Sequence, residues 1–174
     1  QAAGEAGFTW GERGTLRPTL DIHGMPGGFT GPGKKTVLPA RASAKVSMRL
    51  VPDQDPAEVA ELFAAHVRSL APATVAVEVR TLGLAKPSVV DLHAPAIQAA
   101  AQALQAAFGV APVYMRAGGT LPIVADFQDI LGAPVVMMGF GLPDDNVHAP
   151  NEHIHLPNFY RGIETVIHYL ALLP

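Results

Sequence analysis

Residues 134–152, PVVMMGFGLPDDNVHAPNE, hold the strongest structural and chemical signal in this chain. The apolar run at 134–138 has the composition of a β-strand covered on both faces. It leads into a loop with two adjacent carboxylates, an amide and the imidazole of His148. Because α/β folds place their chemistry in loops at strand ends, the stretch indicates an α/β domain in which His148 is a candidate zinc ligand. A polar loop with a simply hydrogen-bonded histidine is the open alternative.

The pattern around this stretch alternates between helix and strand from about residue 85 onward. We expect helices at 95–108, 121–131 and 157–172, the first two ended by glycine, and strands at 113–115 and 134–138. Such alternation is typical of a doubly wound, mostly parallel sheet. Two strands are too few for a stable sheet of this kind, so we expect this half to be incomplete.

The first half has a different pattern. Apolar and polar residues alternate at 19–23, 41–51 and 74–81, which predicts three strands. Asp55-Pro56-Ala57-Glu58 combines an acidic cap, a proline and a later glutamate, and so predicts the start of a helix. Residues 1–17 are expected to be a helix remnant or a loop. The predicted fold class is therefore α/β: an antiparallel α+β sandwich, then part of a doubly wound, mostly parallel α/β domain.

Composition excludes several classes of protein. Charged residues make up 16% of the 174 residues, against about 25% in ordinary soluble domains, which suggests that another polypeptide covers part of the surface. A net charge of −3 argues against nucleic acid as a partner. There is no cysteine, hence no disulfide and no thiolate metal site, and no apolar run has the length of a membrane span. The chain begins at Gln1, so we expect it to be processed, trimmed or part of a longer protein.

Two glycine-rich segments are candidate anion sites. Gly28–Lys35 is similar to a phosphate-binding loop, but Lys35 replaces the required Ser or Thr and a strand is expected to follow, so nucleotide binding is disfavoured. The segment Arg116–Thr120 lies between an expected strand and an expected helix. It is either a binding site at a helix N-terminus or a tight turn capped by Thr120.

Four residues with metal-binding side chains lie within eight positions: His148, Glu152, His153 and His155. Three imidazoles could hold a metal by themselves. We expect His153 and His155, however, to point apart if the backbone between them is extended. We therefore expect this chain alone to bind zinc weakly, because one good ligand falls short of the three or four that a stable site needs.

Six motifs, in this order, resemble the C-terminal portion of the two-zinc amidohydrolase family that contains cytosolic non-specific dipeptidase, carnosinase, carboxypeptidase G, aminoacylase and succinyl-diaminopimelate desuccinylase. They are Arg17-Pro18-Thr19-Leu20, Gly27-Gly28-Phe29, Lys35-Thr36-Val37-Leu38-Pro39, Met48-Arg49-Leu50-Val51-Pro52, Arg116-Ala117-Gly118-Gly119-Thr120 and Gly141–Glu152. The resemblance runs from about Thr15 to the end of the chain, and it is nearest to the dipeptidase branch.

The resemblance implies a lid or dimerisation domain, here residues 1–84, inserted into a zinc-binding domain whose second half is residues 85–174. It implies that His148 is a zinc ligand and that Arg49 and Thr36 grip the carboxylate end of the substrate. Gly119 and Thr120 would face the same substrate. Two zinc ions are implied per complete active site, with manganese or cobalt as alternatives. The other ligands and the catalytic base would lie upstream, so no catalytic residue is expected in this chain.

The function implied by the resemblance is that of a zinc-dependent metallopeptidase acting on a dipeptide or an N-acyl amino acid, with this chain inactive alone. The expected partners are that small substrate, the N-terminal half of the same protein and a second copy bound through the lid, with no nucleic acid and no membrane. The expected location is cytoplasmic. A non-catalytic lid or dimerisation fragment is the alternative. Ala117, Thr120 and residues 82–84 depart from the family pattern, which suggests a substrate other than an ordinary dipeptide.

Overall fold

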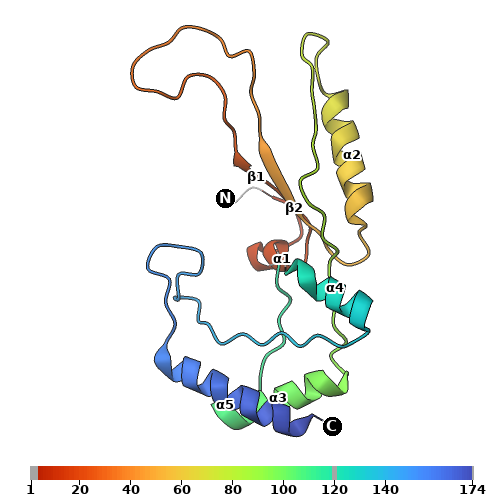
Figure 1. Ribbon diagram of the computed structural model, residues 1–174, viewed down its shortest axis with the longest axis vertical. Helices are drawn as coiled ribbons and strands as arrows, with labels where there is room; N and C mark the ends of the chain where they lie inside the picture. The colour runs from red at the N-terminus through yellow and green to blue at the C-terminus, as the bar shows by residue number, and fades with distance from the viewer. Residues whose placement is uncertain (1–3, 119–120, 174) are drawn as a thin grey trace. The chain divides into compact units, whose positions relative to one another are not determined.

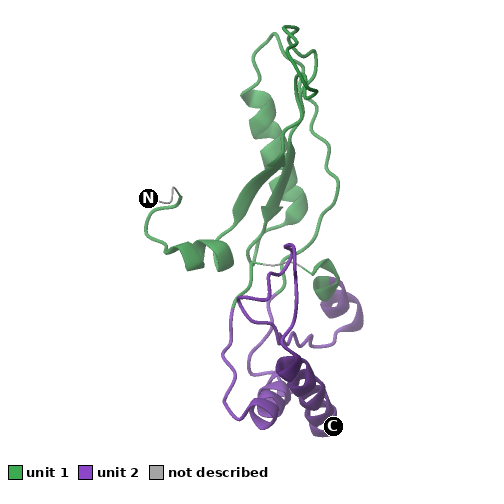
Figure 2. Cartoon of the chain, turned by 90° about the vertical axis from the view of Figure 1, so that its left-hand side faces the viewer, with its two compact units in different colours: residues 1–88, 116–125 green, residues 89–115, 126–174 purple. Residues whose placement is uncertain are grey.

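The computed structural model describes residues 4–118 and 121–173, and the chain divides into two compact units. Unit 1 contains the residues up to Ser88 together with Arg116–Ala125, and unit 2 contains Val89–Met115 and the residues from Asp126 onward (Figure 2). The order of elements along the chain is α1, β1, β2, α2, α3, α4 and α5 (Figure 1).

The sheet of unit 1 consists of β1 (Thr19–Gly24) and β2 (Lys45–Arg49), which pair antiparallel. Leu20 lies opposite Met48 and Ile22 lies opposite Val46, so one face of the sheet is apolar. The other face is polar and ends at Arg49, which lies opposite Thr19. These two strands were predicted from the alternating pattern, and β2 is shorter than predicted.

The two helices that lie wholly within unit 1 begin at side-chain caps. The Asp55 carboxylate accepts the N–H groups of Ala57 and Glu58 at 2.9 Å each and starts α2 (Pro56–Ser69), as predicted. Helix α1 (Trp10–Thr15) starts at a capping box formed by Thr9 and Glu12. The N-terminal segment, predicted from the sequence to be a helix remnant or a loop, therefore contains a short helix.

The core of unit 2 is the packing of α3 (Pro95–Phe108) against α5 (Leu156–Leu172), which lie side by side in Figures 1 and 2. Helix α3 contributes the buried Ile97 and three buried alanines, and α5 contributes Gly162 and Thr165. The Thr165 hydroxyl donates to the Arg161 carbonyl at 2.7 Å, so its burial leaves no hydroxyl unpaired. Small residues at this contact let the two helices approach closely.

Helix α4 (Pro122–Leu131) ends at Gly132, which has a φ of 60°. Helix α3 ends in the same way at Gly109, with a φ of 75°. Glycine adopts this left-handed conformation without a Cβ penalty, which makes it a common helix terminator. The three helices predicted for the second half are thus confirmed, with boundaries that differ by at most one residue.

Three predicted strands are wrong. The segments at 74–81, 113–115 and 134–138 form no strand, and β1 with β2 is the one sheet among the described residues. A strand is held by hydrogen bonds to a neighbouring strand, and no described segment pairs with these three. Each segment leaves an apolar side chain open to solvent: Val75 is 54% exposed, Val113 84% and Met137 58%. What the structure supports is a mixed α/β chain with a small antiparallel sheet.

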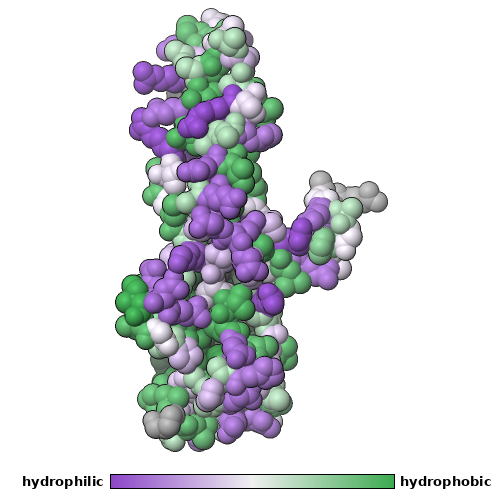
Figure 3. All heavy atoms as spheres, turned by 90° about the vertical axis from the view of Figure 1, so that its right-hand side faces the viewer, coloured by the Kyte–Doolittle hydropathy of each residue, from purple (hydrophilic) through white to green (hydrophobic). Residues whose placement is uncertain are grey.

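Apolar side chains reach the surface in both units. The face in Figure 3 shows hydrophobic residues interspersed among hydrophilic ones. One example is the apolar side of α5, where Ile163, Val166, Ile167 and Leu170 are 41–62% exposed. None of the described helices is both long enough and apolar enough to cross a bilayer.

Candidate metal centre

Phe140 anchors the loop at 139–155 to the helices of unit 2. Its ring stacks on Phe108 of α3, with the ring centroids 6.3 Å apart and the planes 6° from parallel. The same ring lies against Gly162 of α5, where an added Cβ would come within 3.1 Å of it. The side-chain amide of Asn158 donates to the Phe140 carbonyl at 3.2 Å. The start of the loop is therefore fixed to both core helices of the unit.

The backbone of this loop takes left-handed conformations at three non-glycine residues, Asn146, His148 and Asn151, with φ between 55° and 63°. Asparagine tolerates this conformation well, and histidine does so at some cost. The turn is held by the Ala149 N–H, which donates to the Asn146 carbonyl at 2.9 Å, and by the His148 N–H, which donates to the Glu152 carboxylate at 3.4 Å. Such strain concentrates at functional sites, which draws attention to His148.

The His148 imidazole is exposed and makes no hydrogen bond to any described residue. A neutral imidazole in this state has a nitrogen lone pair available for a metal ion. A zinc site takes three or four protein ligands, so a centre at His148 requires further ligands. His148 fits the role of one ligand in such a centre.

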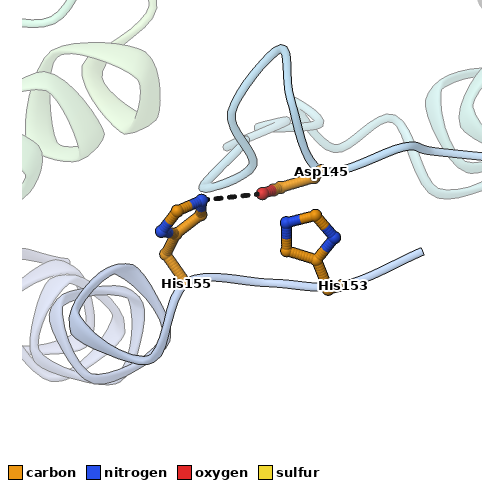
Figure 4. A group of neighbouring side chains, drawn as sticks. All are labelled: Asp145, His153 and His155. Atoms are coloured by element: carbon orange, nitrogen blue, oxygen red, sulfur yellow. Dashed lines mark ion pairs between the residues drawn. The ribbon is translucent and has the colours of Figure 1, made fainter. Parts of the chain in front are cut away.

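A second set of possible ligands is formed by Asp145, His153 and His155, which each place one ligand atom within 4.8 Å of the other two (Figure 4). The Asp145 side chain is 4% exposed. Its Oδ2 accepts the Leu142 N–H at 2.8 Å, and its Oδ1 lies 3.7 Å from the His155 Nε2. The His153 N–H donates to the Asp145 carbonyl at 3.0 Å, which ties the two parts of the loop together.

The expectation that His153 and His155 point apart is wrong. Their ring centroids are 5.6 Å apart and their planes are inclined by 51°. The backbone at His155, the residue that precedes α5, is extended, with φ −72° and ψ 119°. Side chains two positions apart on an extended backbone lie on the same face, so the expectation misapplied the alternation of a strand. The group that forms also differs from the one weighed from the sequence, since Asp145 takes part and His148 does not.

Two of the predicted substrate-binding residues, Thr36 and Arg49, belong to unit 1. Arg49 is exposed at the end of β2. Thr36 is exposed in the loop between β1 and β2, and not at the start of a strand as the sequence suggested. Gly119 and Thr120 lie outside the described residues. The disfavoured phosphate-loop segment, 28–35, lies in the same loop as Thr36 and no helix follows it before β2.

Residues 7–172 match the family model described as Peptidase family M20/M25/M40. The chain belongs to this family. It is 36% identical over 158 residues to the Cys-Gly metallodipeptidase DUG1 of Saccharomyces cerevisiae, an overlap of 88% of this chain and 32% of that protein. It is 37% identical over 150 residues to the Beta-Ala-His dipeptidase of Rattus norvegicus, covering 83% of this chain and 30% of that one.

The fold of this M20-family chain is also similar to solved structures of the family. The M20 metallo-carboxypeptidase Sso-CP2 from Sulfolobus solfataricus matches with a TM-score of 0.80 and 32% identity, over 92% of this chain and 37% of the other. The chain thus spans about a third of the length of the relatives it matches. These similarities confirm the resemblance found in the six motifs.

Proposed function

We propose that this chain is part of a zinc-dependent hydrolase that cleaves the amide bond of dipeptides or N-acyl amino acids. Membership of the M20 family over residues 7–172 is the observation that carries the proposal. The relatives are named for Cys-Gly and for β-Ala-His, which share an amide bond and a free carboxylate at the C-terminal end. A site for such substrates needs a metal centre and a cationic group for that carboxylate.

The proposed metal ligand of this chain is His148. Its exposed imidazole supports this role, because a ring nitrogen that makes no hydrogen bond to a described residue remains available to an ion. A zinc ion held there would supply Lewis-acid chemistry, polarising the scissile carbonyl and making water a better nucleophile. His148 contributes one coordinating nitrogen, and the upstream part of the protein is proposed to provide the other ligands and the general base.

The proposed carboxylate clamp is Arg49, and Thr36 is proposed to grip the same end of the substrate. The guanidinium can donate two parallel hydrogen bonds to a carboxylate, which fixes both the position and the orientation of the substrate. Holding the amide in place in this way lowers the entropic part of the barrier to hydrolysis. Gly119 and Thr120 are proposed to face the same substrate.

The proposal extends to the arrangement of the complete protein. Residues 1–84 are proposed as the lid, residues 85–174 as the second half of the zinc domain, with two zinc ions per site and a homodimer formed through the lid. Aliphatic side chains on α5 are open to solvent. This exposure supports the proposal that the upstream part of the protein packs against α5 in the zinc domain.

The proposal is tested on the complete protein with Cys-Gly, β-Ala-His and an N-acetyl amino acid as substrates. We expect hydrolysis of at least one of them, its loss after metal chelation and its recovery with zinc. His148→Ala should abolish the recovery. His93→Ala is the matched control, since His93 is also exposed and belongs to the same unit. A complete protein that hydrolyses none of the three with zinc, manganese or cobalt would favour the non-catalytic alternative.

A further inference from the structure

We infer that Asp145, His153 and His155 form a second divalent-metal site, separate from the centre at His148, that clips the His148 loop to the start of α5. The three residues belong to one unit, and one ligand atom of each lies within 4.8 Å of the others. Figure 4 shows the three side chains converging on a common point. The inference does not depend on the proposed hydrolase activity.

The hydrogen bond made by His153 prepares its ring for a metal. Its Nδ1 lies 2.9 Å from the Asn151 carbonyl oxygen. A carbonyl only accepts hydrogen bonds, so Nδ1 carries the hydrogen and Nε2 keeps its lone pair. In Figure 4 the opposite ring nitrogen faces Asp145. A carbonyl that orients a ligating histidine in this way is a regular feature of protein metal sites.

The spacing between His155 and Asp145 suits a shared ion better than a direct bond. The Nε2 of His155 lies 3.7 Å from Oδ1 of Asp145 and also 3.7 Å from Oδ2 of Asp144. A direct hydrogen bond would require about 2.7–3.2 Å. Tetrahedral zinc, with bonds of about 2.0–2.2 Å, holds its ligand atoms about 3.3–3.6 Å apart. This pair therefore needs only a small contraction to share an ion, and the ligand atoms of all three residues lie within 4.8 Å of one another.

The buried carboxylate is the independent observation that points to a ligand. Asp145 is 3% exposed, and its Oδ1 has no hydrogen-bond partner among the described residues. A buried carboxylate oxygen without a partner is unfavourable, because its lost hydration is not replaced. Oδ2 is held by the Leu142 N–H, which fixes the orientation of the group and directs Oδ1 toward the two imidazoles. A cation at that point would supply the missing partner.

The donor set defines the class of ion. Two imidazole nitrogens and one carboxylate oxygen, with a remaining position for water, suit zinc and neighbouring divalent transition metals better than calcium or magnesium. Asp145 precedes His148 by three positions and His155 follows it by seven, so an ion here closes the loop around His148. The site would thereby stabilise the left-handed backbone that directs the His148 ring.

The test is a calorimetric titration of the 174-residue chain with zinc, using single variants of each ligand. We expect one zinc per chain, and His153→Ala, His155→Ala and Asp145→Asn should each raise the Kd about tenfold or more, since even residues that only orient a ligand are worth 10–100-fold in affinity. Asp145→Asn preserves an oxygen for the Leu142 N–H, so the loop can keep its fold. Circular dichroism checks that each variant does so.

Two further variants separate this site from other histidines. His168→Ala is the matched control and should leave zinc binding unchanged. The His168 side chain is 44% exposed and its Nε2 lies 3.7 Å from a Glu164 carboxylate oxygen, whereas His155 is 43% exposed and lies 3.7 Å from Asp145. His148→Ala should also leave it unchanged. Zinc should in addition slow amide hydrogen exchange at residues 145–155. The inference is overturned if folded chain binds no zinc, if His148→Ala weakens binding as much as His153→Ala, or if the three ligand variants bind like the parent.

Discussion

Arg49 is the residue whose loss should separate substrate use from folding. It is exposed at the end of β2, so we expect the sheet to remain folded when it is replaced by alanine. In the complete protein, losing a charge-assisted fork to a substrate carboxylate costs on the order of 2–5 kcal/mol, so kcat/KM should fall roughly 30-fold or more. Steady-state kinetics on Cys-Gly or β-Ala-His measure this.

Two comparisons sharpen the Arg49 prediction. Arg49→Lys should restore only part of kcat/KM, because an ammonium group cannot form the planar fork. Arg41→Ala, at another exposed arginine of the same unit, should have little effect. Unchanged kinetics of Arg49→Ala on a substrate with a free carboxylate would show that the clamp lies elsewhere.

The capping box of α1 is expected to make the stability of the fold depend on pH. Hydrogen bonds from the Thr9 hydroxyl and the Thr9 backbone N–H lower the pKa of the Glu12 carboxyl below its usual value. The folded state therefore favours the ionised Glu12 carboxylate. The contribution of this carboxylate to the stability of the fold is fully present above the pKa that it has in the unfolded chain. That contribution is lost as the pH falls through the lower pKa of the folded state. An NMR titration of the Glu12 side chain should show the lowered pKa, and Thr9→Ala should raise it toward the usual value. An identical titration curve in Thr9→Ala would contradict the assignment.

How far the sequence could predict a site residue depends on whether its signal is local. His148 and Asp55 stand in local motifs, and the structure places Asp55 at the predicted cap. The capping box at Thr9 and Glu12 was missed, although a threonine followed three residues later by glutamate is its ordinary signal. The role of Asp145 could not be predicted, because it depends on a fold that brings His153 and His155 beside a buried carboxylate.

At the scale of elements, the contact between Phe140 and α5 should control the stability of unit 2. An alanine at position 162 would place its Cβ 3.1 Å from the Phe140 ring, which is held by stacking on Phe108. Overpacking of this kind costs about 1–3 kcal/mol, which exceeds the gain of about 1 kcal/mol from replacing a helical glycine. Gly162→Ala should therefore lower the free energy of unfolding, measured by denaturant titration of the complete protein.

The background variant Phe140→Leu provides the control for that prediction. The smaller side chain leaves room at position 162, so Gly162→Ala should there stabilise the protein or leave it unchanged. Gly11→Ala in α1, where an added Cβ meets nothing within 4 Å, should also not destabilise it. If Gly162→Ala were equally harmful in both backgrounds, the contact with Phe140 would not be its cause.

Helices and strands differed in how well they could be predicted, for a physical reason. The helices carry their own signals: Pro56 and Pro95 at the first turns, and Gly109 and Gly132 at the ends. Each helix is held by hydrogen bonds within its own segment. A strand depends on a neighbour, and the predicted strands at 74–81, 113–115 and 134–138 find none among the described residues.

For the whole molecule, the exposed apolar side of α5 predicts association. A groove of about 370 Å³ on this side is lined by Phe140, Ile154, Phe159, Gly162, Ile163, Val166 and Ile167. Exposed apolar surface of this kind is rare on a stable monomer. We expect the chain alone to self-associate in sedimentation experiments, and co-expression with the upstream part of its protein to give a soluble complex with metal-dependent hydrolase activity.

The control for this prediction is Ile163→Lys on the open side of α5, where Ile163 is 47% exposed. It should reduce self-association of the chain alone and weaken its complex with the upstream part. A parent chain that is monodisperse, monomeric and melts cooperatively by itself would show that these residues need no further covering.

The most direct test of the central claim is anomalous diffraction at the zinc edge from crystals of the complete protein. The account predicts zinc in the active site with one imidazole nitrogen of His148 at about 2.0–2.1 Å from an ion, and the remaining ligands from the upstream part of the protein. An active site fully occupied by zinc whose ligands do not include His148 would contradict it.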